Sequence, residues 1–199
     1  MVCMGVRLTV EGSPPKAPFY LVANHISLVD IFVIASELGC VFVSKAELGD
    51  WPVGGFITRR MKTIYINRSS KRDTRRVNQE ITDVMQSGLG VVAFPESTTT
   101  QDGYMLPFKP ALLQSAIDLD MPVHVASLWY GTPEDPERGI EKVLWKDGTT
   151  ALGNFINIAG LGGCECRLVF SEETVSAPER RELAQKAQEA VVRIHTPIA

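Results

Sequence analysis

The sequence predicts an α/β fold, a single domain in which a largely parallel or mixed sheet is flanked by helices. Three observations support this prediction. Short apolar segments rich in β-branched residues alternate with longer segments of helical periodicity. Glycine and proline stand where the helices should end or begin. The chain has 199 residues, 45% of them hydrophobic, which is enough to bury one sizeable core.

The predicted strands are apolar segments bounded by turn residues. They are 19–23, 41–44, 63–66, 90–94, 123–129, 142–145 and 166–170. The predicted helices between them are 28–38, 71–86, 110–118, 150–158 and 178–195. Because the strands are almost continuously apolar, we expect helices to cover both faces of the sheet. We therefore interpret residues 1–199 as one domain, in which 140–199 completes the sheet.

Several helix boundaries have a clear chemical signal. Gly88 follows the helix predicted over 71–86, where glycine accepts the left-handed backbone of a helix end. Pro110 suits a first helical turn, because its missing N–H would be unpaired there in any case. Ser69 or Ser70 is expected to cap the start of the helix over 71–86.

A histidine and an aspartate follow the first of these strands, in residues 24–30 (Asn-His-Ile-Ser-Leu-Val-Asp). Histidine, with an unperturbed pKa of about 6.5, takes and returns protons near neutral pH, and a carboxylate on one ring nitrogen leaves the other free to act as a base. Ser27 is a good helix N-cap, with Asp30 three residues later as in a capping box. Since side chains of a first turn tilt toward the N-terminus, Asp30 can reach His25. The alternative is that Asp30 only caps the helix and His25 is an ordinary loop residue.

A second polar segment, residues 94–100 (Phe-Pro-Glu-Ser-Thr-Thr-Thr), follows another predicted strand about seventy residues later. Ligands of open α/β sheets bind beyond the carboxyl ends of the strands. His25 and Glu96 each follow an apolar strand, so we expect them to share one site. Glu96 could instead cap the turn that follows it.

Charge is unevenly distributed along the chain, whose net charge is −3. Residues 59–76 carry eight basic side chains and one acidic one, a net +7 that leaves −10 for the remainder. Such a segment favours an anionic partner, a phosphate head group or an anionic membrane surface. Nucleic acid is disfavoured, because aromatic residues are not interleaved to stack on bases. Arg68 ends a strand and could point into a site, whereas the basic residues of 71–76 could equally be a solvated helix face.

Other functions find little support in the sequence. The four cysteines include a single Cys-x-Cys pair and have no histidine grouped with them, so we expect free thiols, no metal and no cofactor. There is no phosphate-loop pattern and no Gly-x-Ser-x-Gly. No segment approaches the roughly 18 apolar residues of a membrane-spanning helix. The first ten residues lack a signal-peptide core.

Taken in order, these motifs resemble the glycerolipid (lysophosphatidic acid) acyltransferase family, and the chain is PlsC-like. The resemblance covers about residues 5–130, and four short motifs in the right order make it specific. The first motif contains His25 and Asp30. The second is a central block made of 44–48, Pro52, Gly55 and 63–68, the third is 94–98, and the later blocks are 106–109 and 121–123.

The resemblance implies transfer of a fatty acyl group from acyl-CoA or acyl-carrier protein to the free hydroxyl of a lysolipid, in phospholipid biosynthesis. The commonest acceptor of the family is lysophosphatidic acid (1-acyl-sn-glycerol-3-phosphate). His25 would be the general base and Asp30 would orient and charge-stabilise it, with direct attack of the hydroxyl on the thioester. Arg68 would bind an anionic head group. The substrate-binding residues implied by the matching motifs are Arg68, Glu96, Ser97, Thr98, Lys45 and Asn24.

The sequence departs from the family pattern after Phe-Pro-Glu, where Ser97 replaces a glycine and Thr99 replaces an arginine. Serine is tolerable if the backbone there stays in an ordinary region. Threonine cannot replace the bidentate phosphate contacts of arginine, so a lyso-ornithine lipid competes with lysophosphatidic acid as the acceptor. The sequence favours lysophosphatidic acid narrowly.

Family members often carry a membrane helix before this region, and this chain begins almost at the core. Either that segment was removed or, as we expect, the protein attaches peripherally on the cytoplasmic side of a membrane. The attaching side chains would be Trp51, Phe56, Ile57 and Met61 beside Arg59, Arg60 and Lys62, although these apolar residues could equally belong to the core.

Two further classes of function remain open. An esterase or thioesterase would use the same His25–Asp30 pair to activate water, and its hydrolysis would not depend on an acceptor. A non-catalytic lipid-binding module would bind without turnover, which the intact pair disfavours.

Overall fold

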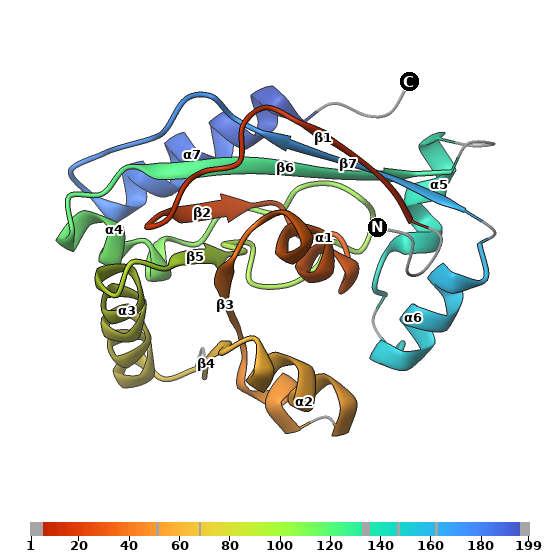
Figure 1. Cartoon of the computed structure of the whole chain (residues 1–199), viewed down its shortest axis with the longest axis horizontal. Coiled ribbons are helices and arrows are strands. Elements are labelled where there is room, and N and C mark those ends of the chain that lie inside the picture. Colours follow the sequence, from red (N-terminus) through yellow and green to blue (C-terminus); the bar gives the residue numbers. More distant parts are fainter. Residues whose placement is uncertain are drawn as a thin grey trace.

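The computed structural model describes residues 6–50, 52–67, 69–132, 136–146, 148–161 and 163–195. Its strands are β1 (Val6–Glu11), β2 (Tyr20–Ala23), β3 (Cys40–Lys45), β4 (Ile64–Ile66), β5 (Gly90–Ala93), β6 (Val123–Gly131) and β7 (Cys164–Phe170). These form one mixed sheet in the order β1-β7-β6-β2-β5-β3-β4 (Figure 1). Neighbouring strands are parallel except β6 and β7, which are antiparallel. The predicted fold class is therefore confirmed.

Helices cover both faces of this sheet. They are α1 (Val29–Glu37), α2 (Pro52–Arg60), α3 (Lys71–Gln86), α4 (Gln114–Asp118), α5 (Pro136–Val143), α6 (Ala151–Ala159) and α7 (Arg180–Ile194), with 3-10 turns η1 (Ala46–Asp50) and η2 (Pro110–Leu112). Apolar residues of α1, α5 and α6 pack on one face, and those of α3, α4 and α7 pack on the other. Coverage on both faces explains why every residue of β2 and β5 is buried.

The order of the central strands brings the predicted site together. β2 lies beside β5, and β5 lies beside β3, all parallel. The segments that follow these strands therefore leave the sheet at the same edge, where α1 begins after β2 and η1 begins after β3 (Figure 1). His25 and Glu96 lie on the segments after β2 and β5, and Lys45 is the last residue of β3.

One predicted element is wrong, and others were missed. The segment 142–145 is not a strand, because α5 runs to Val143 and packs Ile140 and Val143 against the core beside β6. Their three-residue spacing is the helical signal that the short apolar run concealed. The sequence analysis also missed β1, η1 and α2. The two glycines of α2 lower its helix propensity, and β1 is an edge strand with a mixed burial pattern.

The helix ends agree more closely with expectation. Ser70 caps α3, its hydroxyl accepting from the backbone N–H of Asp73, and Gly88 follows α3 with a φ of 87°. Pro110 begins η2, and the predicted helix over 110–118 divides there into η2 and α4.

Three expectations concern cysteines, metals and membrane spans. Cys40, Cys164 and Cys166 carry free thiols, and Cys3 lies outside the described residues. Among the residues described, no three His, Cys, Asp or Glu side chains are grouped as metal ligands would be. A search of the same residues finds no helix long and apolar enough to span a membrane.

Candidate active site

His25 and Asp30 meet at the start of α1. The Nδ1 atom of His25 lies 2.7 Å from Oδ2 of Asp30. The Asp30 side chain is fully buried, while 15% of the His25 side chain is exposed. With Asp30 ionised, Nδ1 carries the proton of the neutral ring and Nε2 is left with a free lone pair. The predicted contact is confirmed, and the catalytic role of the pair stays a prediction.

The turn before α1 is organised by the same carboxylate. Oδ2 of Asp30 accepts hydrogen bonds from the backbone N–H groups of Ile26 (2.7 Å) and Ser27 (2.9 Å). Asp30 therefore closes the turn and binds the imidazole at the same time, so both of the contacts that the sequence suggested for it are present. The prediction that Ser27 is the N-cap is wrong, since Leu28 occupies that position and the Ser27 hydroxyl instead donates to Oδ1 of Asn154.

Aromatic stacking fixes the plane of the imidazole. The rings of His25 and Phe94 lie 4.1 Å apart between centroids at an interplanar angle of 14°. Phe42 continues the stack 6.3 Å beyond Phe94. Because Phe94 ends the strand segment that leads into Glu96, the second motif positions the histidine ring directly.

Glu96 holds the backbone of the site rather than facing the pocket. One carboxylate oxygen accepts from the His25 N–H at 2.7 Å and the other from the Leu106 N–H at 2.6 Å. The His25 carbonyl in turn accepts from the N–H of Thr100 at 3.1 Å. The loop after β5 thus binds both the N–H and the carbonyl of His25. A direct contact of Glu96 with substrate stays a prediction.

Burial raises the pKa of Glu96 to about 7. The two backbone hydrogen bonds act in the opposite direction, and the negative charge of Asp30 adds to the rise. A carboxylic acid that titrates near neutral pH beneath the His25 backbone makes the site sensitive to pH.

Asn24 has a comparable structural contact. Its side-chain amide donates to the carbonyl of Leu128 at 2.9 Å and accepts from the N–H of Leu128 at 2.8 Å. This pair of bonds extends the β2–β6 pairing past Ala23 and fixes the position of His25 relative to β6. Asn24 is buried and does not line the pocket, so its predicted contact with substrate remains untested.

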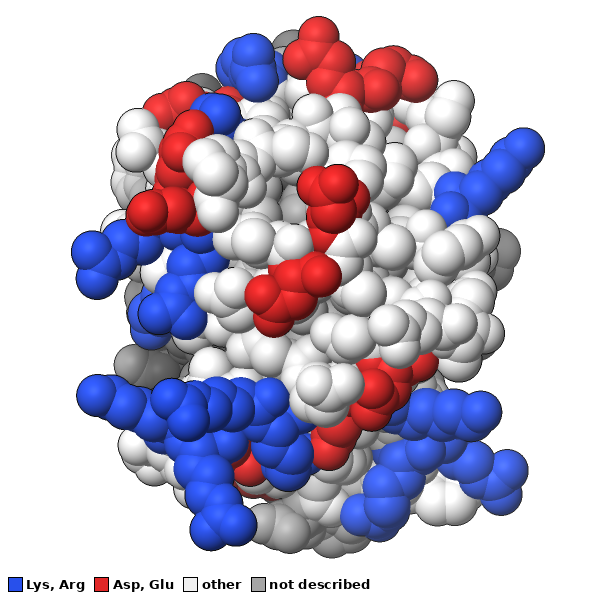
Figure 2. Space-filling model, turned by 90° about the vertical axis from the view of Figure 1, so that its left-hand side faces the viewer, with Lys and Arg blue, Asp and Glu red and all other residues white. Residues whose placement is uncertain are grey.

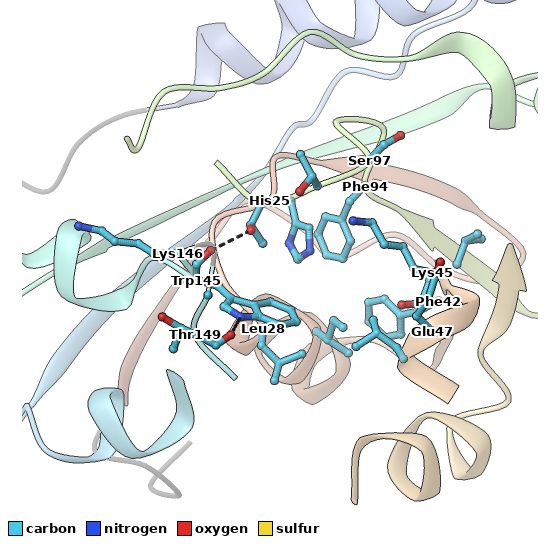
Figure 3. Close-up of a pocket in the computed structure, with 17 residues that line it drawn as sticks. His25, Leu28, Phe42, Lys45, Glu47, Phe94, Ser97, Trp145, Lys146 and Thr149 are labelled. Atoms are coloured by element: carbon cyan, nitrogen blue, oxygen red, sulfur yellow. Dashed lines mark hydrogen bonds between the residues drawn. The ribbon is translucent and has the colours of Figure 1, made fainter. Parts of the chain in front are cut away.

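A pocket of about 290 Å³ opens beside His25 (Figure 3). Its wall is largely apolar, with polar side chains near His25. The lining residues are His25, Leu28, Ile31, Phe42, Val43, Ser44, Lys45, Glu47, Leu48, Phe94, Ser97, Thr98, Thr99, Trp145, Lys146, Gly148 and Thr149.

Three predicted substrate contacts line this pocket. They are Lys45, Ser97 and Thr98, and Figure 3 shows Lys45 reaching from the end of β3 toward the stacked rings of His25 and Phe94. Arg68 lies outside the described residues. Ser97 has a φ of 68°, so the condition under which serine would replace glycine without cost is not met. An L-residue in this left-handed region is strained by about 1–2 kcal/mol, which a glycine avoids.

One wall of the pocket was not predicted from the sequence; it is formed by Trp145, Lys146, Gly148 and Thr149. The Thr99 hydroxyl donates to the Trp145 carbonyl at 3.2 Å, and the Trp145 indole donates to the Thr149 carbonyl at 2.8 Å. Figure 3 shows the Trp145 ring over Leu28 and the Lys146 side chain directed away from His25. The available signal was an aromatic residue followed by a turn, which also describes many surface loops.

This wall is joined to the His25 turn by Asn154 of α6. The side-chain amide of Asn154 donates to the Leu144 carbonyl at 3.1 Å, while its oxygen accepts from Ser27. Residues from beyond the recognised motifs thus complete the site.

The fold and this geometry define a class of protein: an α/β protein with a hydrogen-bonded histidine–aspartate pair beside a pocket at the carboxyl edge of its sheet. A comparison with protein families specifies the class further. The model of the family described as Acyltransferase matches residues 6–130, and the chain belongs to that family.

Named relatives agree with this assignment. The 1-acyl-sn-glycerol-3-phosphate acyltransferase of Neisseria gonorrhoeae is 33% identical over 156 residues, which are 73% of this chain and 61% of that protein. The chain thus spans about three fifths of this relative. The lyso-ornithine lipid O-acyltransferase of Pseudomonas aeruginosa is 30% identical over 185 residues, 93% of this chain and 70% of that protein.

A solved structure shares the fold. The 1-acyl-sn-glycerophosphate acyltransferase PlsC of Thermotoga maritima superposes with a TM-score of 0.66 at 24% identity. The match covers 96% of this chain and 73% of that one. The predicted resemblance to the glycerolipid acyltransferases is confirmed.

We predict that Ser97→Gly raises the free energy of unfolding by about 0.5–1 kcal/mol, because glycine relieves the left-handed strain. Denaturant unfolding would measure the change. Gly88→Ser is the matched reverse change, since Gly88 has a φ of 87° and open space around its missing Cβ. It should lose a similar amount, and a destabilised Ser97→Gly variant would contradict the prediction.

We also predict a pH-dependent stability difference between the wild-type protein and Glu96→Gln. The folded pKa of Glu96, about 7, lies above its ordinary value of 4.5. The unfolded chain therefore releases this proton first as pH rises. The wild-type advantage over Glu96→Gln should fall by about 3 kcal/mol between roughly pH 4.5 and 7 and stay level above that range. Unfolding at a series of pH values measures it, and a constant difference would refute the assignment.

Proposed function

We propose that this protein is an O-acyltransferase that moves a fatty acyl group from a thioester donor to the free hydroxyl of a lysolipid. The observation that carries the proposal is the 2.7 Å contact between His25 and the buried Asp30 at the wall of an apolar pocket. Membership of the acyltransferase family supports it.

In the proposed reaction, Nε2 of His25 takes the proton of the acceptor hydroxyl. The hydroxyl oxygen attacks the thioester carbonyl carbon, so that a C–O bond forms and the C–S bond breaks. The departing thiolate then recovers the proton from the imidazolium. A positioned base of this kind contributes roughly 10²–10⁴ in rate. Asp30 stabilises the imidazolium that exists between the two proton transfers.

Lys45, Ser97 and Thr98 are the proposed substrate contacts within the pocket, because their side chains line it. The Lys45 ammonium is the proposed partner of an anionic group on either substrate. Arg68 is proposed for the acceptor head group from the sequence motif alone. Glu96 and Asn24 are proposed to act through the backbone that they hold.

Two acceptors are candidates. Lysophosphatidic acid has the support of the Neisseria relative, as the acceptor in the name of that enzyme. A specific observation favours a lyso-ornithine lipid. Thr99 stands where the family pattern has a phosphate-binding arginine, and its hydroxyl is directed to the Trp145 carbonyl. The Pseudomonas relative that matches most of this chain bears the corresponding name.

We further propose that α2 attaches the protein to an anionic membrane surface. Phe56 is 56% exposed, and the Arg60 guanidinium lies 5.3 Å from the centre of its ring. α2 packs against η1, whose Glu47 and Leu48 line the pocket. Met61, by contrast, packs against the core, and Trp51 and the Ile57 side chain lie outside the described residues.

Charge near α2 supports this orientation. Figure 2 shows lysines and arginines gathered over the lower part of one face, at the height of α2 and α3 in Figure 1, with acidic side chains between them. Arg76 already pairs with Asp73 and Glu80, so part of this charge is neutralised within α3.

Transfer would be tested by supplying acyl-CoA or acyl-carrier protein with lysophosphatidic acid, with lyso-ornithine lipid, or with neither, and following diacyl product and free fatty acid by mass spectrometry. We expect acceptor-dependent diacyl product. His25→Ala should lower its rate at least 10²-fold, because the base is lost. His124→Gln is the matched control and should keep its activity, because His124 is absent from the pocket wall.

The other outcomes have definite meanings. Free fatty acid that forms without regard to acceptor would make the protein an esterase or thioesterase. Saturable lipid binding with no turnover would make it a lipid-binding module. Either result would overturn the transferase proposal.

For membrane attachment, we predict that Phe56→Ser with Arg60→Gln reduces co-sedimentation with anionic vesicles at least fivefold, since a basic residue near such a surface contributes about 1 kcal/mol. Val192→Ser with Arg193→Gln is the matched control, because Val192 is 55% exposed on α7, at the opposite end of the molecule in Figure 1. Equal losses in both double variants would refute a role for α2.

A further inference from the structure

A second oxygen of the Asp30 carboxylate is left without a partner. Oδ2 takes the contacts to His25, Ile26 and Ser27, whereas Oδ1 is buried with no hydrogen-bond partner among the described residues. A buried carboxylate oxygen without a donor loses its hydration and gains nothing in return. We therefore expect a hydrogen-bond donor close to Oδ1.

A matching donor lies on β6. The Tyr130 hydroxyl is also buried and also lacks a regular hydrogen bond among the described residues. The Tyr130 side chain is fully inaccessible to solvent. One unsatisfied donor and one unsatisfied acceptor therefore occupy the same apolar interior.

The chain topology brings these two groups together. Asn24 binds both backbone groups of Leu128, which fixes β6 against the His25 turn. Tyr130 is two residues further along the strand, so its side chain leaves the same face as that of Leu128. Leu128, Tyr130 and Val29 of α1 belong to one apolar cluster, and the Tyr130 hydroxyl interacts with the Asp30 carboxylate and with Cys166, its cross-strand neighbour on β7.

We propose that Tyr130 is a positioning residue of the site, whose hydroxyl donates to Oδ1 of Asp30 and holds this carboxylate in place behind His25. The proposal rests on the proposed function of the His25–Asp30 pair. Burial holds the pKa of Tyr130 well above its ordinary value, so the phenol stays protonated and can only donate its proton to a carboxylate.

The effect of this hydrogen bond on His25 has a definite sign. A donor on Oδ1 draws charge away from Oδ2, and its positive hydrogen opposes a second positive charge on the imidazole. Tyr130 therefore lowers the proton affinity of the pair. Without the hydroxyl, His25 should hold its proton to higher pH and be a free base over a narrower range.

Other titratable groups surround the pair. Glu96 binds the His25 backbone and is influenced by the charge of Asp30, and Lys45 extends from β3 toward the rings of His25 and Phe94. The thiol of Cys166 lies beside Tyr130, with Cys164 influencing Cys166, and burial raises the pKa of both thiols, which keeps them neutral. A test must therefore remove the hydroxyl and leave these groups in place.

Tyr130→Phe keeps the packing and removes the hydroxyl. The chain has three histidines, so proton and nitrogen NMR can follow each titration, with His25 assigned by its loss in His25→Gln. We expect the His25 midpoint to rise by about 0.5–1 pH unit in Tyr130→Phe, with His124 unchanged. The acid limb of kcat should shift upward by the same amount, and KM should stay constant.

Tyr20→Phe is the matched control, because Tyr20 is equally buried and its hydroxyl donates to the Leu112 carbonyl at 3.0 Å, away from the site. It should lower stability and leave the His25 midpoint in place. A His25 midpoint that stays fixed or falls in Tyr130→Phe overturns the proposal. The NMR result stands even if the protein transfers no acyl group, so the two proposals can fail separately.

Discussion

The rest of the site depends on the buried carboxylate of Asp30. A carboxylate without exposure to water carries a desolvation penalty of several kcal/mol, which its hydrogen bonds must offset. Three donors converge on Oδ2, two from the backbone of the preceding turn and one from His25. The shape of the turn, the tautomer of the imidazole and the direction of its free nitrogen therefore all follow from one ionised oxygen.

The remaining motif residues hold the histidine in front of this carboxylate. Glu96 binds its backbone N–H and Thr100 its carbonyl, Asn24 bonds the same segment to β6, and Phe94 stacks on the ring. Several of these contacts are to main-chain atoms, which a change of substrate does not alter. The backbone contacts set the position of the proposed base, whereas Lys45 and the other side chains that line the pocket are the proposed substrate contacts.

The parts of this arrangement that could be predicted from sequence are those encoded locally. Apolar runs between turn residues identified the central strands. The tilt of side chains in a first helical turn toward the N-terminus predicted that Asp30 reaches His25. The orientation of Glu96 could not be predicted, because it depends on backbone N–H groups that only the fold brings near. These belong to His25, 71 residues away in sequence, and to Leu106, 10 residues away along an irregular loop. The segment 142–145 was misassigned because its local pattern is ambiguous: four apolar or amphipathic residues fit a strand and a helix end equally well.

The least predictable part of the site is the wall formed by Trp145, Lys146, Gly148 and Thr149. The same wall offers the best explanation for the proposed specificity toward the acceptor head group. An arginine at position 99 would bring five donors and a positive charge, which the Trp145 carbonyl alone could not satisfy. Threonine offers one hydroxyl, and that hydroxyl meets this carbonyl. The departure from the family motif and the position of the wall are therefore a single structural feature. Because the wall lies outside the segment matched by the family, residues 6–130, we propose that head-group preference in this protein depends on contacts that the shared motifs do not contain.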